Sequence, residues 1–333
     1  MNYRPYLQGG IAVSEIGFGA WQLGVESGWK AVSEAEAERM IWTALDHSIN
    51  FFDTAPNYGM GTGEERLGKV FKGVDRDRIV VNTKFGRLDN GQIDFSPEQI
   101  QPSIERSLKR LQIDCLDSAI IHSPPSELLN GNACDHYEVL ERIIDQGKIK
   151  ACGASVDFAS EITTLLETTN ARVFQSFFNI LHQDTKGAFD LVQEKGAAVI
   201  AKIPFDSGWL TGKYDAQSTF EGVRARWSRE DIATRARLVD RVKEIVGEEL
   251  MPSALSFCTA FDAVSTVIPG AVSEAQLLAN IQAIQQPMPA DQRAQLEAFF
   301  EDEVRALKLP WRIPPEAYLR GHVDSIDFGH PRH

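Results

Sequence analysis

The sequence predicts a closed (β/α)8 barrel, an α/β fold also called a TIM barrel, on three observations. Short runs rich in Val, Ile and Phe alternate with helical patterns along most of the 333 residues, as βα units around a parallel sheet do. A long irregular segment at 208–233 follows the seventh run, where a barrel carries functional loops. The competing fold, an open doubly wound sheet, is disfavoured because no G-x-G-x-x-G follows the first run.

An N-terminal β-hairpin that turns at Gly9 and Gly10 precedes the eight strands predicted for the barrel. Each predicted strand is a short apolar run bounded by turn residues or by a helical pattern. In chain order, the predicted strands are Glu15–Gly19, Ile49–Asp53, Ile79–Lys84, Leu116–His122, Ile149–Ser155, Arg172–Phe177, Ala198–Ile203 and Ala263–Ile268.

Helices between the strands are predicted from their start signals and from an apolar stripe. Capping-box patterns begin at Ser33, Ser96 and Ser273, each with Glu or Gln three residues later. The segments Glu34–Asp46 and Ile100–Leu111 repeat apolar residues with the helical period. These helices suit the outer layer of a barrel, and we expect one extra helix towards the C-terminus.

Composition predicts one soluble domain over residues 1–333, because no linker or low-complexity tract interrupts the series. The chain carries 34 basic and 47 acidic residues, a formal net charge of -13, which disfavours nucleic acid and anionic membranes as partners. Its four cysteines lack disulfide or zinc spacing, and no apolar run is long enough for a membrane span. We expect a cytoplasmic protein without a metal site, and its oligomeric state stays open.

Four polar residues lie at the ends of predicted strands or just after them. Asp53, Lys84 and His122 end three strands, and Tyr58 follows in the loop after Asp53. The carboxyl ends of barrel strands meet at one rim, so these side chains are expected together. An ammonium stabilises a phenolate, a carboxylate holds that ammonium in place, and a neutral imidazole orients a carbonyl. Taken singly each residue has an ordinary structural role, but as a group they predict proton transfer to a carbonyl.

The motifs around these residues resemble those of the aldo-keto reductase superfamily. GFGAWQLG, FFDTAPNYG, TKFG, SIERSLKRLQIDCLDSAIIH and PFDSGWLTGKY follow one another in that family's order. The spacing of Asp53, Tyr58, Lys84 and His122 fits the family's catalytic tetrad. The resemblance runs from about Ile11 to Asn280 and implies an oxidoreductase that reduces aldehydes or ketones, sugars among them, to alcohols. It implies NADP(H) as cofactor, with NAD(H) also usable, and a small carbonyl compound as substrate.

The resemblance also implies contacts with the cofactor, in which four parts of the sequence take part besides Asp53. In many members of the family an Asn follows the serine that binds the carboxamide, and a tyrosine stacks on the nicotinamide. Here Val156 and Lys202 stand at those two positions. The implied contacts are Ala20, Trp21 and Gln22 at the nicotinamide ribose, Ser155 and Gln175 at the carboxamide, Leu210, Gly212 and Lys213 at the pyrophosphate, and Gly270, Gln276 and Asn280 at the adenosine.

The adenosine segment predicts weak discrimination between the two cofactors. Selection for NADPH needs cations or strong donors at the 2′-phosphate, and residues 269–292 contain neither Lys nor Arg, while Glu274 adds a negative charge. Backbone N–H groups at the start of the following helix, or Arg224 and Arg226 from the long loop, are the alternatives for holding a phosphate.

Two other functions stay open at this point. One is a cofactor-sensing regulatory subunit of the potassium-channel β-subunit type, which shares the fold and the tetrad. The other is a Schiff-base lyase with Lys84 as the amine nucleophile. A protein partner with slow turnover of every aldehyde would support the first, and borohydride trapping of substrate on Lys84 would support the second.

Overall fold

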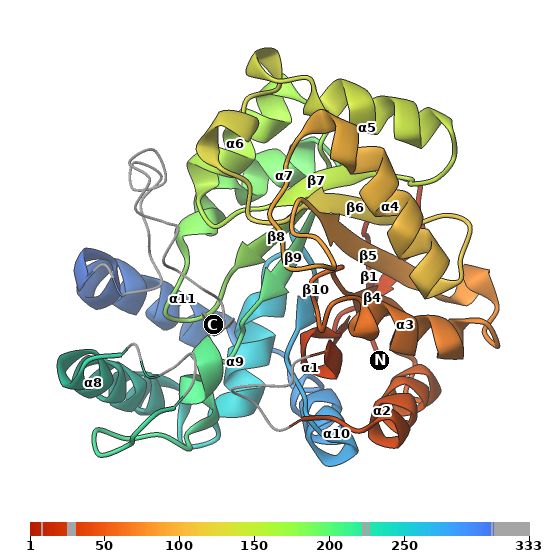
Figure 1. The fold of residues 1–333 in the computed structure, drawn as a ribbon. Helices are drawn as coiled ribbons and strands as arrows, with labels where there is room; N and C mark the ends of the chain where they lie inside the picture. The colour runs from red at the N-terminus through yellow and green to blue at the C-terminus, as the bar shows by residue number, and fades with distance from the viewer. Residues whose placement is uncertain (8, 25–30, 222–224, 226, 308, 310–333) are drawn as a thin grey trace.

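A computed structural model describes residues 1–7, 9–24, 31–221, 225, 227–307 and 309, and it shows a barrel of eight parallel strands. The strands pair in chain order from β3 to β10. A parallel bridge between Ile16 and Val267 joins the last strand to the segment before the first, with the Gly17 N–H donating to the Val267 carbonyl at 2.8 Å. Figure 1 shows the strands at the centre with the helices around them. The predicted (β/α)8 barrel is confirmed.

The carboxyl ends of the strands agree with the predicted ends within one residue, whereas several amino ends begin later. One reason is that Leu116 and Ile149 pair only through an isolated bridge before regular β6 and β7 begin. The hairpin strands are β1 (Tyr3–Arg4) and β2 (Val13–Ser14), and the barrel strands are β3 (Phe18–Gly19), β4 (Phe51–Asp53), β5 (Val80–Phe85), β6 (Ser118–Ile121), β7 (Cys152–Ser155), β8 (Val173–Phe177), β9 (Ala198–Lys202) and β10 (Val264–Ile268).

Helices follow the barrel strands, and two more, α8 and α11, pack together at one side of the barrel (Figure 1). Helix α11 is the extra C-terminal helix that the sequence predicts. The helices are α1 (Trp21–Gly24), α2 (Glu34–Asp46), α3 (Thr62–Phe71), α4 (Pro97–Leu111), α5 (His136–Asp145), α6 (Ala159–Thr168), α7 (Phe189–Glu194), α8 (Arg229–Val246), α9 (Leu250–Thr259), α10 (Glu274–Ala283) and α11 (Ala290–Phe299).

The predicted caps hold for two helices and fail for one. Ser33 and Ser273 accept hydrogen bonds from the backbone N–H three residues later, at 3.2 and 3.3 Å. Ser96 does not cap α4, because its hydroxyl donates to Asp94 Oδ1 at 2.6 Å instead. The competing acceptor two residues earlier, which forms a local turn, explains this failure.

The irregular segment after β9 is shorter than predicted. Helix α8 begins at Arg229, because Ser228 and Asp231 form a reciprocal capping box. Before it, the loop builds an aromatic core in which Trp209 packs 5.5 Å from Tyr214 and 5.6 Å from Phe220, centroid to centroid. Arg224 and Arg226 lie outside the described residues.

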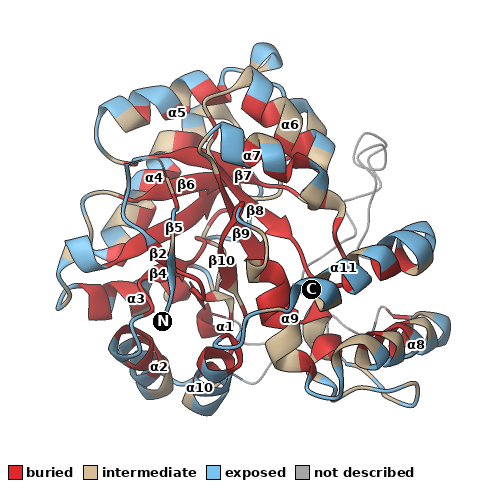
Figure 2. Ribbon diagram, turned by 180° about the vertical axis from the view of Figure 1, so that it is seen from behind, coloured by how far each residue is buried: buried red, intermediate tan, exposed pale blue. Residues whose placement is uncertain are grey.

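Burial follows the layers of the fold. Figure 2 shows the strands buried and the outer faces of the helices exposed. At the amino ends of the strands the hairpin lies under the barrel, where Tyr6 is 3% exposed and packs against Phe51 with centroids 5.2 Å apart. In the part of the chain that the structure describes, no helix is long and apolar enough to cross a membrane.

Candidate active site

Three of the four predicted tetrad residues are joined by hydrogen bonds at the carboxyl ends of β4 and β5. The ammonium of Lys84 donates to Asp53 Oδ2 at 2.9 Å and to the Tyr58 hydroxyl at 3.1 Å. Asp53 ends β4, Lys84 is the fifth residue of β5, and Tyr58 lies in the loop before α3. The strands thus bring a carboxylate, an ammonium and a phenol into one line.

Lys84 is held as a charged donor. It is 1% exposed, and its third partner is the Thr54 carbonyl at 2.8 Å, so all three N–H donors are used. Burial by itself lowers the pKa of Lys84, but the charge of Asp53 and then the interaction with Tyr58 outweigh burial and raise the pKa above its usual value. A Schiff-base nucleophile must be a neutral amine with an open position, so this geometry disfavours the lyase alternative.

Tyr58 is placed by a close approach of two backbone segments. A Cβ atom at Gly24, the last residue of α1, would lie 2.3 Å from the Tyr58 carbonyl oxygen, so only glycine fits there. Burial raises the pKa of the Tyr58 phenol, and the charge of Lys84 opposes this without cancelling it. The phenol is therefore protonated at neutral pH and is available as a proton donor.

His122 follows β6 and faces Tyr58, with the two rings edge to face at 6.0 Å. Burial, reinforced by the charges of Lys84, Arg87 and Lys202, holds the pKa of His122 well below its usual value. The imidazole is neutral at physiological pH, and its buried Nδ1 has no hydrogen-bond partner among the described residues. A neutral imidazole with an unused nitrogen suits the binding of a carbonyl oxygen.

These pKa directions predict a pH profile. We expect the turnover number for carbonyl reduction to be flat from about pH 6 to about pH 8, because His122 stays neutral and Tyr58 stays protonated across that range. Turnover should fall only when the phenol ionises at high pH. The measurement is turnover against pH at saturating substrate, with His122→Gln as comparison. An inflection near pH 6.5 in the wild type that disappears in His122→Gln would contradict the assignment.

The two residues predicted at the carboxamide lie side by side, since Ser155 at the end of β7 pairs in register with Gln175 in the middle of β8. Gln175 Nε2 donates to Asp53 Oδ1 at 2.6 Å, and Lys202 Nζ donates to Ser155 Oγ at 2.9 Å. Lys202 also pairs with Asp157 at 3.0 Å. The lysine at the position where many family members have a stacking tyrosine is thus bonded to Ser155, one of the two residues predicted at the carboxamide.

Gln22 and Gly270 come together from α1 and the loop after β10. A Cβ atom on Gly270 would lie 1.9 Å from Gln22 Nε2, and Gln22 Oε1 is buried without a partner in the described part of the chain. Asn280 Nδ2 donates to the Gly270 carbonyl at 3.4 Å. Ala20 donates its N–H to the Asp53 carbonyl at 2.8 Å, and Trp21 begins α1. An unsatisfied amide oxygen beside a residue without a side chain fits a polar cofactor group.

The predicted pyrophosphate segment follows β9 and is held by an ion pair with α8. Leu210 is buried, while Gly212 and Lys213 come after the turn Asp206–Thr211. Asp206 is fully buried and accepts from Arg235 Nε of α8 at 3.1 Å. The segment therefore lies at the same rim as the tetrad, although no described hydrogen bond joins the two.

Two polar neighbours of the site are absent from the sequence-based prediction. Asp157 pairs with Lys202, and its only signal is its place just after the end of β7. Asn82 Nδ2 donates to Asp53 Oδ1 at 2.7 Å. Asn82 lies two residues before Lys84 in β5, a spacing that puts both side chains on one face of a strand. Among the described residues, no group of three or more His, Cys, Asp or Glu side chains is arranged to hold a metal ion.

A family model and individual relatives both match this chain. The model of the Aldo/keto reductase family matches residues 15–301. Aldo-keto reductase YhdN of Bacillus subtilis (strain 168) is 31% identical over 229 residues, which cover 67% of each chain. A probable voltage-gated potassium channel subunit beta of Arabidopsis thaliana is 28% identical over 309 residues, 85% of this chain and 91% of that one.

A solved structure extends the likeness to three dimensions. The holo form of an aldo-keto reductase from Bacillus halodurans superposes with a TM-score of 0.73 at 28% identity. The match covers 90% of this chain and 96% of that one. Sequence and fold therefore agree with one family over most of the chain.

Proposed function

Since the chain belongs to the aldo/keto reductase family, we propose that it reduces aldehydes or ketones, sugars among them, with NAD(P)H. The observation that carries this proposal is the ammonium of Lys84, which lies between the Asp53 carboxylate and the Tyr58 hydroxyl at 2.9 and 3.1 Å. Such a group supports proton transfer to a carbonyl oxygen.

A bound nicotinamide cofactor supplies the hydride, and the chain's own residues supply the proton and the orientation. Neutral His122 holds the carbonyl oxygen towards Tyr58, and the phenol donates its proton to that oxygen as negative charge develops there. The charge of Lys84 favours this transfer because it stabilises the phenolate that remains. The residues proposed to hold the cofactor are Ala20, Trp21, Gln22, Asp53, Ser155, Gln175, Leu210, Gly212, Lys213, Gly270, Gln276 and Asn280.

The direct test is a panel of aldehydes, ketones and aldoses assayed with NADH and with NADPH by nicotinamide absorbance. The proposal expects turnover of several members and loss of that turnover in Tyr58→Phe. Tight cofactor binding with no turnover of any carbonyl compound would contradict it.

The structure adds support for weak discrimination against NADH. At the start of α10 the Glu274 N–H donates to the Glu36 carboxylate at 2.9 Å, and the Gln276 N–H donates to Ser273 at 3.3 Å. Gln276 Oε1 itself accepts from the Val272 N–H at 3.0 Å. Three backbone N–H donors near the start of α10 are thus already bonded, and Glu36 places a carboxylate among them.

We therefore expect NADH to serve within about 100-fold of NADPH in kcat/KM, about 2.7 kcal/mol. Glu36→Gln should shift the ratio towards NADPH, because it removes a negative charge from the start of α10. Glu38→Gln, an exposed substitution on the same helix, is the matched control. The measurement is the kcat/KM ratio at fixed substrate and ionic strength. A preference for NADPH above about 10³-fold would contradict this prediction, since such a gap requires charge-assisted bonds to the phosphate.

The regulatory-subunit alternative is not favoured. The likeness to a probable potassium channel subunit beta, at 28% identity, accompanies a likeness of similar strength to an aldo-keto reductase. Both proteins match the same barrel, so the resemblance to the channel subunit does not single out a regulatory role.

A further inference from the structure

A line of hydrogen bonds runs through the interior of the barrel from the N-terminal hairpin to the candidate site. The Tyr6 hydroxyl lies 2.6 Å from Ser118 Oγ, and Ser118 Oγ lies 2.6 Å from Asn82 Oδ1. Asn82 Nδ2 in turn lies 2.7 Å from Asp53 Oδ1. All four side chains are buried.

The line has one direction. Asp53 Oδ1 accepts from Lys84 as a carboxylate, so Asn82 must present its N–H₂ group to that oxygen and its carbonyl to Ser118. The Ser118 hydroxyl then donates to Asn82, and the single remaining role for the Tyr6 hydroxyl is to donate to Ser118. Every donor points towards the Asp53 carboxylate, an order in which each hydrogen bond strengthens the next.

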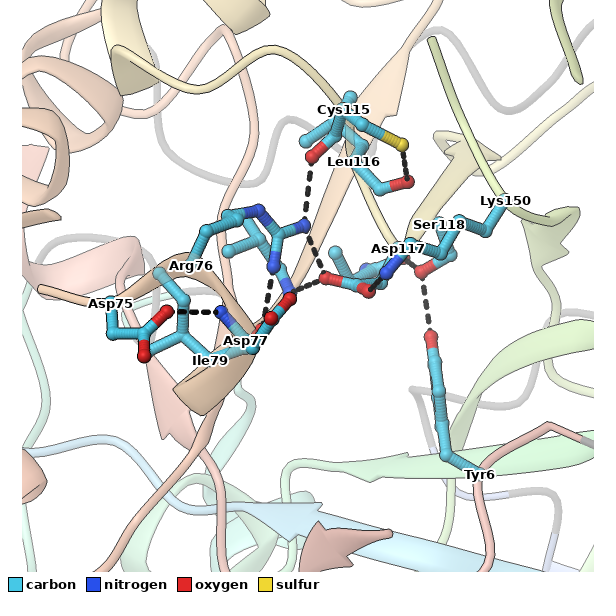
Figure 3. A network of polar contacts seen from close by, with 12 residues as sticks. Tyr6, Asp75, Arg76, Asp77, Ile79, Cys115, Leu116, Asp117, Ser118 and Lys150 are labelled. Atoms are coloured by element: carbon cyan, nitrogen blue, oxygen red, sulfur yellow. Dashed lines mark hydrogen bonds and ion pairs between the residues drawn. The ribbon is translucent and has the colours of Figure 1, made fainter. Parts of the chain in front are cut away.

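Strand register keeps the central members in place. Asp53 pairs with Asn82 across β4 and β5, and Asn82 pairs with Ser118 across β5 and β6. Below them, Asp117 accepts from the Val81 N–H at 2.9 Å, from Arg76 and from Lys150, which ties the starts of β5 and β6 together. Figure 3 shows this anchor and the Tyr6 hydroxyl meeting Ser118 beside it.

The apolar surroundings destabilise these buried polar groups unless each of them has a hydrogen-bond partner. Tyr6 belongs to an apolar cluster with Phe51, Ile120 and Ile200, and burying an amide or hydroxyl there without a hydrogen bond is unfavourable. Aliphatic side chains would fill the same space without that risk. The polar line ends on the one carboxylate oxygen that also receives Lys84 and Gln175.

We propose that Asn82 is a positioning residue for the reaction, and that Ser118 and Tyr6 hold it in that role. Asn82 fixes the Asp53 carboxylate so that Lys84 reaches Asp53 and Tyr58 at once. This inference rests on the proposed reductase function. Without the amide donor, the Asp53 charge concentrates on Lys84, and the ammonium becomes a weaker partner for the Tyr58 hydroxyl.

The test compares Asn82→Leu, a change of similar volume without donors, with the wild type. Turnover should fall about 10-fold or more, as expected when a hydrogen bond to a charged group is lost. The KM for the carbonyl substrate and the Kd for NADH should stay within about twofold, because Asn82 is fully buried and is not among the residues proposed to bind either ligand. In Asn82→Leu the fall in turnover at high pH should move to higher pH, because Lys84 stabilises the phenolate less in that variant. The other charged or titratable groups around Tyr58 are Asp53, His122 and Arg87.

Smaller changes keep the test valid if Asn82→Leu fails to fold. Ser118→Ala and Tyr6→Phe each remove one hydroxyl from the line and should lower turnover about two- to fivefold, within the range expected for a neutral hydrogen bond. Tyr137→Phe is the matched control: its hydroxyl is also buried, but it donates to the Leu128 carbonyl and not to a residue of the polar line. Thermal melting of each variant separates loss of stability from loss of turnover.

A double-mutant cycle tests whether Asn82 affects turnover through the Asp53 carboxylate. In an Asp53→Asn background, Asn82→Leu should change turnover by less than about twofold, because its effect passes through the carboxylate. Equal losses in both backgrounds, or wild-type turnover and pH profile in folded Asn82→Leu, would overturn the inference. If wild-type protein turns over carbonyls and Tyr58→Phe does not, the proposed function stands whatever the Asn82 result.

Discussion

Tyr58→Phe is expected to lose about 10²-fold or more of turnover, the usual scale for a general acid, while cofactor binding survives. The substitution removes one hydroxyl, which is both the proposed proton donor and the atom 3.1 Å from the Lys84 ammonium. The ring and its edge-to-face contact with His122 remain. Losing the proton donor should therefore leave the shape of the site in place.

The measurement is kcat with a carbonyl substrate that the wild type turns over, together with the Kd for NADH from fluorescence. Tyr137→Phe serves as control, because it removes a buried hydroxyl that donates to the Leu128 carbonyl and not to a tetrad residue. Turnover of Tyr58→Phe within about tenfold of the wild type would show that another group donates the proton.

Lys84→Met should abolish most of the reduction rate for a different reason. Burial raises the pKa of the Tyr58 phenol, and the charge of Lys84 lowers it. The substitution removes that charge, so the phenol's pKa rises further and proton donation slows. We expect a loss of about 10²-fold or more. The fold should persist, because Asp53 keeps two amide donors, Asn82 at 2.7 Å and Gln175 at 2.6 Å.

Asp53→Asn should also lower the reduction rate, but more mildly, because the amide still accepts a hydrogen bond from Lys84 while it holds the ammonium less firmly in its charged form and in its place. The experiment measures turnover and pH profile for both variants, with circular dichroism to verify folding. If folded Lys84→Met kept the wild-type rate and pH profile, Lys84 would be a structural lysine without influence on Tyr58.

The barrel was predictable from the sequence because its signals are local. Each strand is an apolar run of a few residues, and each carboxyl end is marked by a polar residue such as Asp53 or by a turn. Ser96 shows the limit of this reasoning: the pattern of a helix cap was present, but a nearer acceptor, Asp94, captured the hydroxyl. A local pattern predicts which bonds can form, whereas competition among acceptors determines which do form.

Contacts between distant residues needed the tertiary structure. The positions of Asp53, Tyr58, Lys84 and His122 in the sequence predicted that they meet at one rim. That Lys84 lies between Asp53 and Tyr58 and bonds to both depends on how β4 and β5 pair, which the sequence does not show.

Alone, the sequence determined the fold class, the position of the polar rim and the resemblance to one family, because periodicity and motif spacing are properties of the chain itself. The tertiary structure decided that Glu36 reaches the start of α10, that Lys202 binds Ser155, and that a polar line ends on Asp53. These pairs are far apart in sequence or lie on different elements, and only strand register and helix packing bring their atoms within bonding distance.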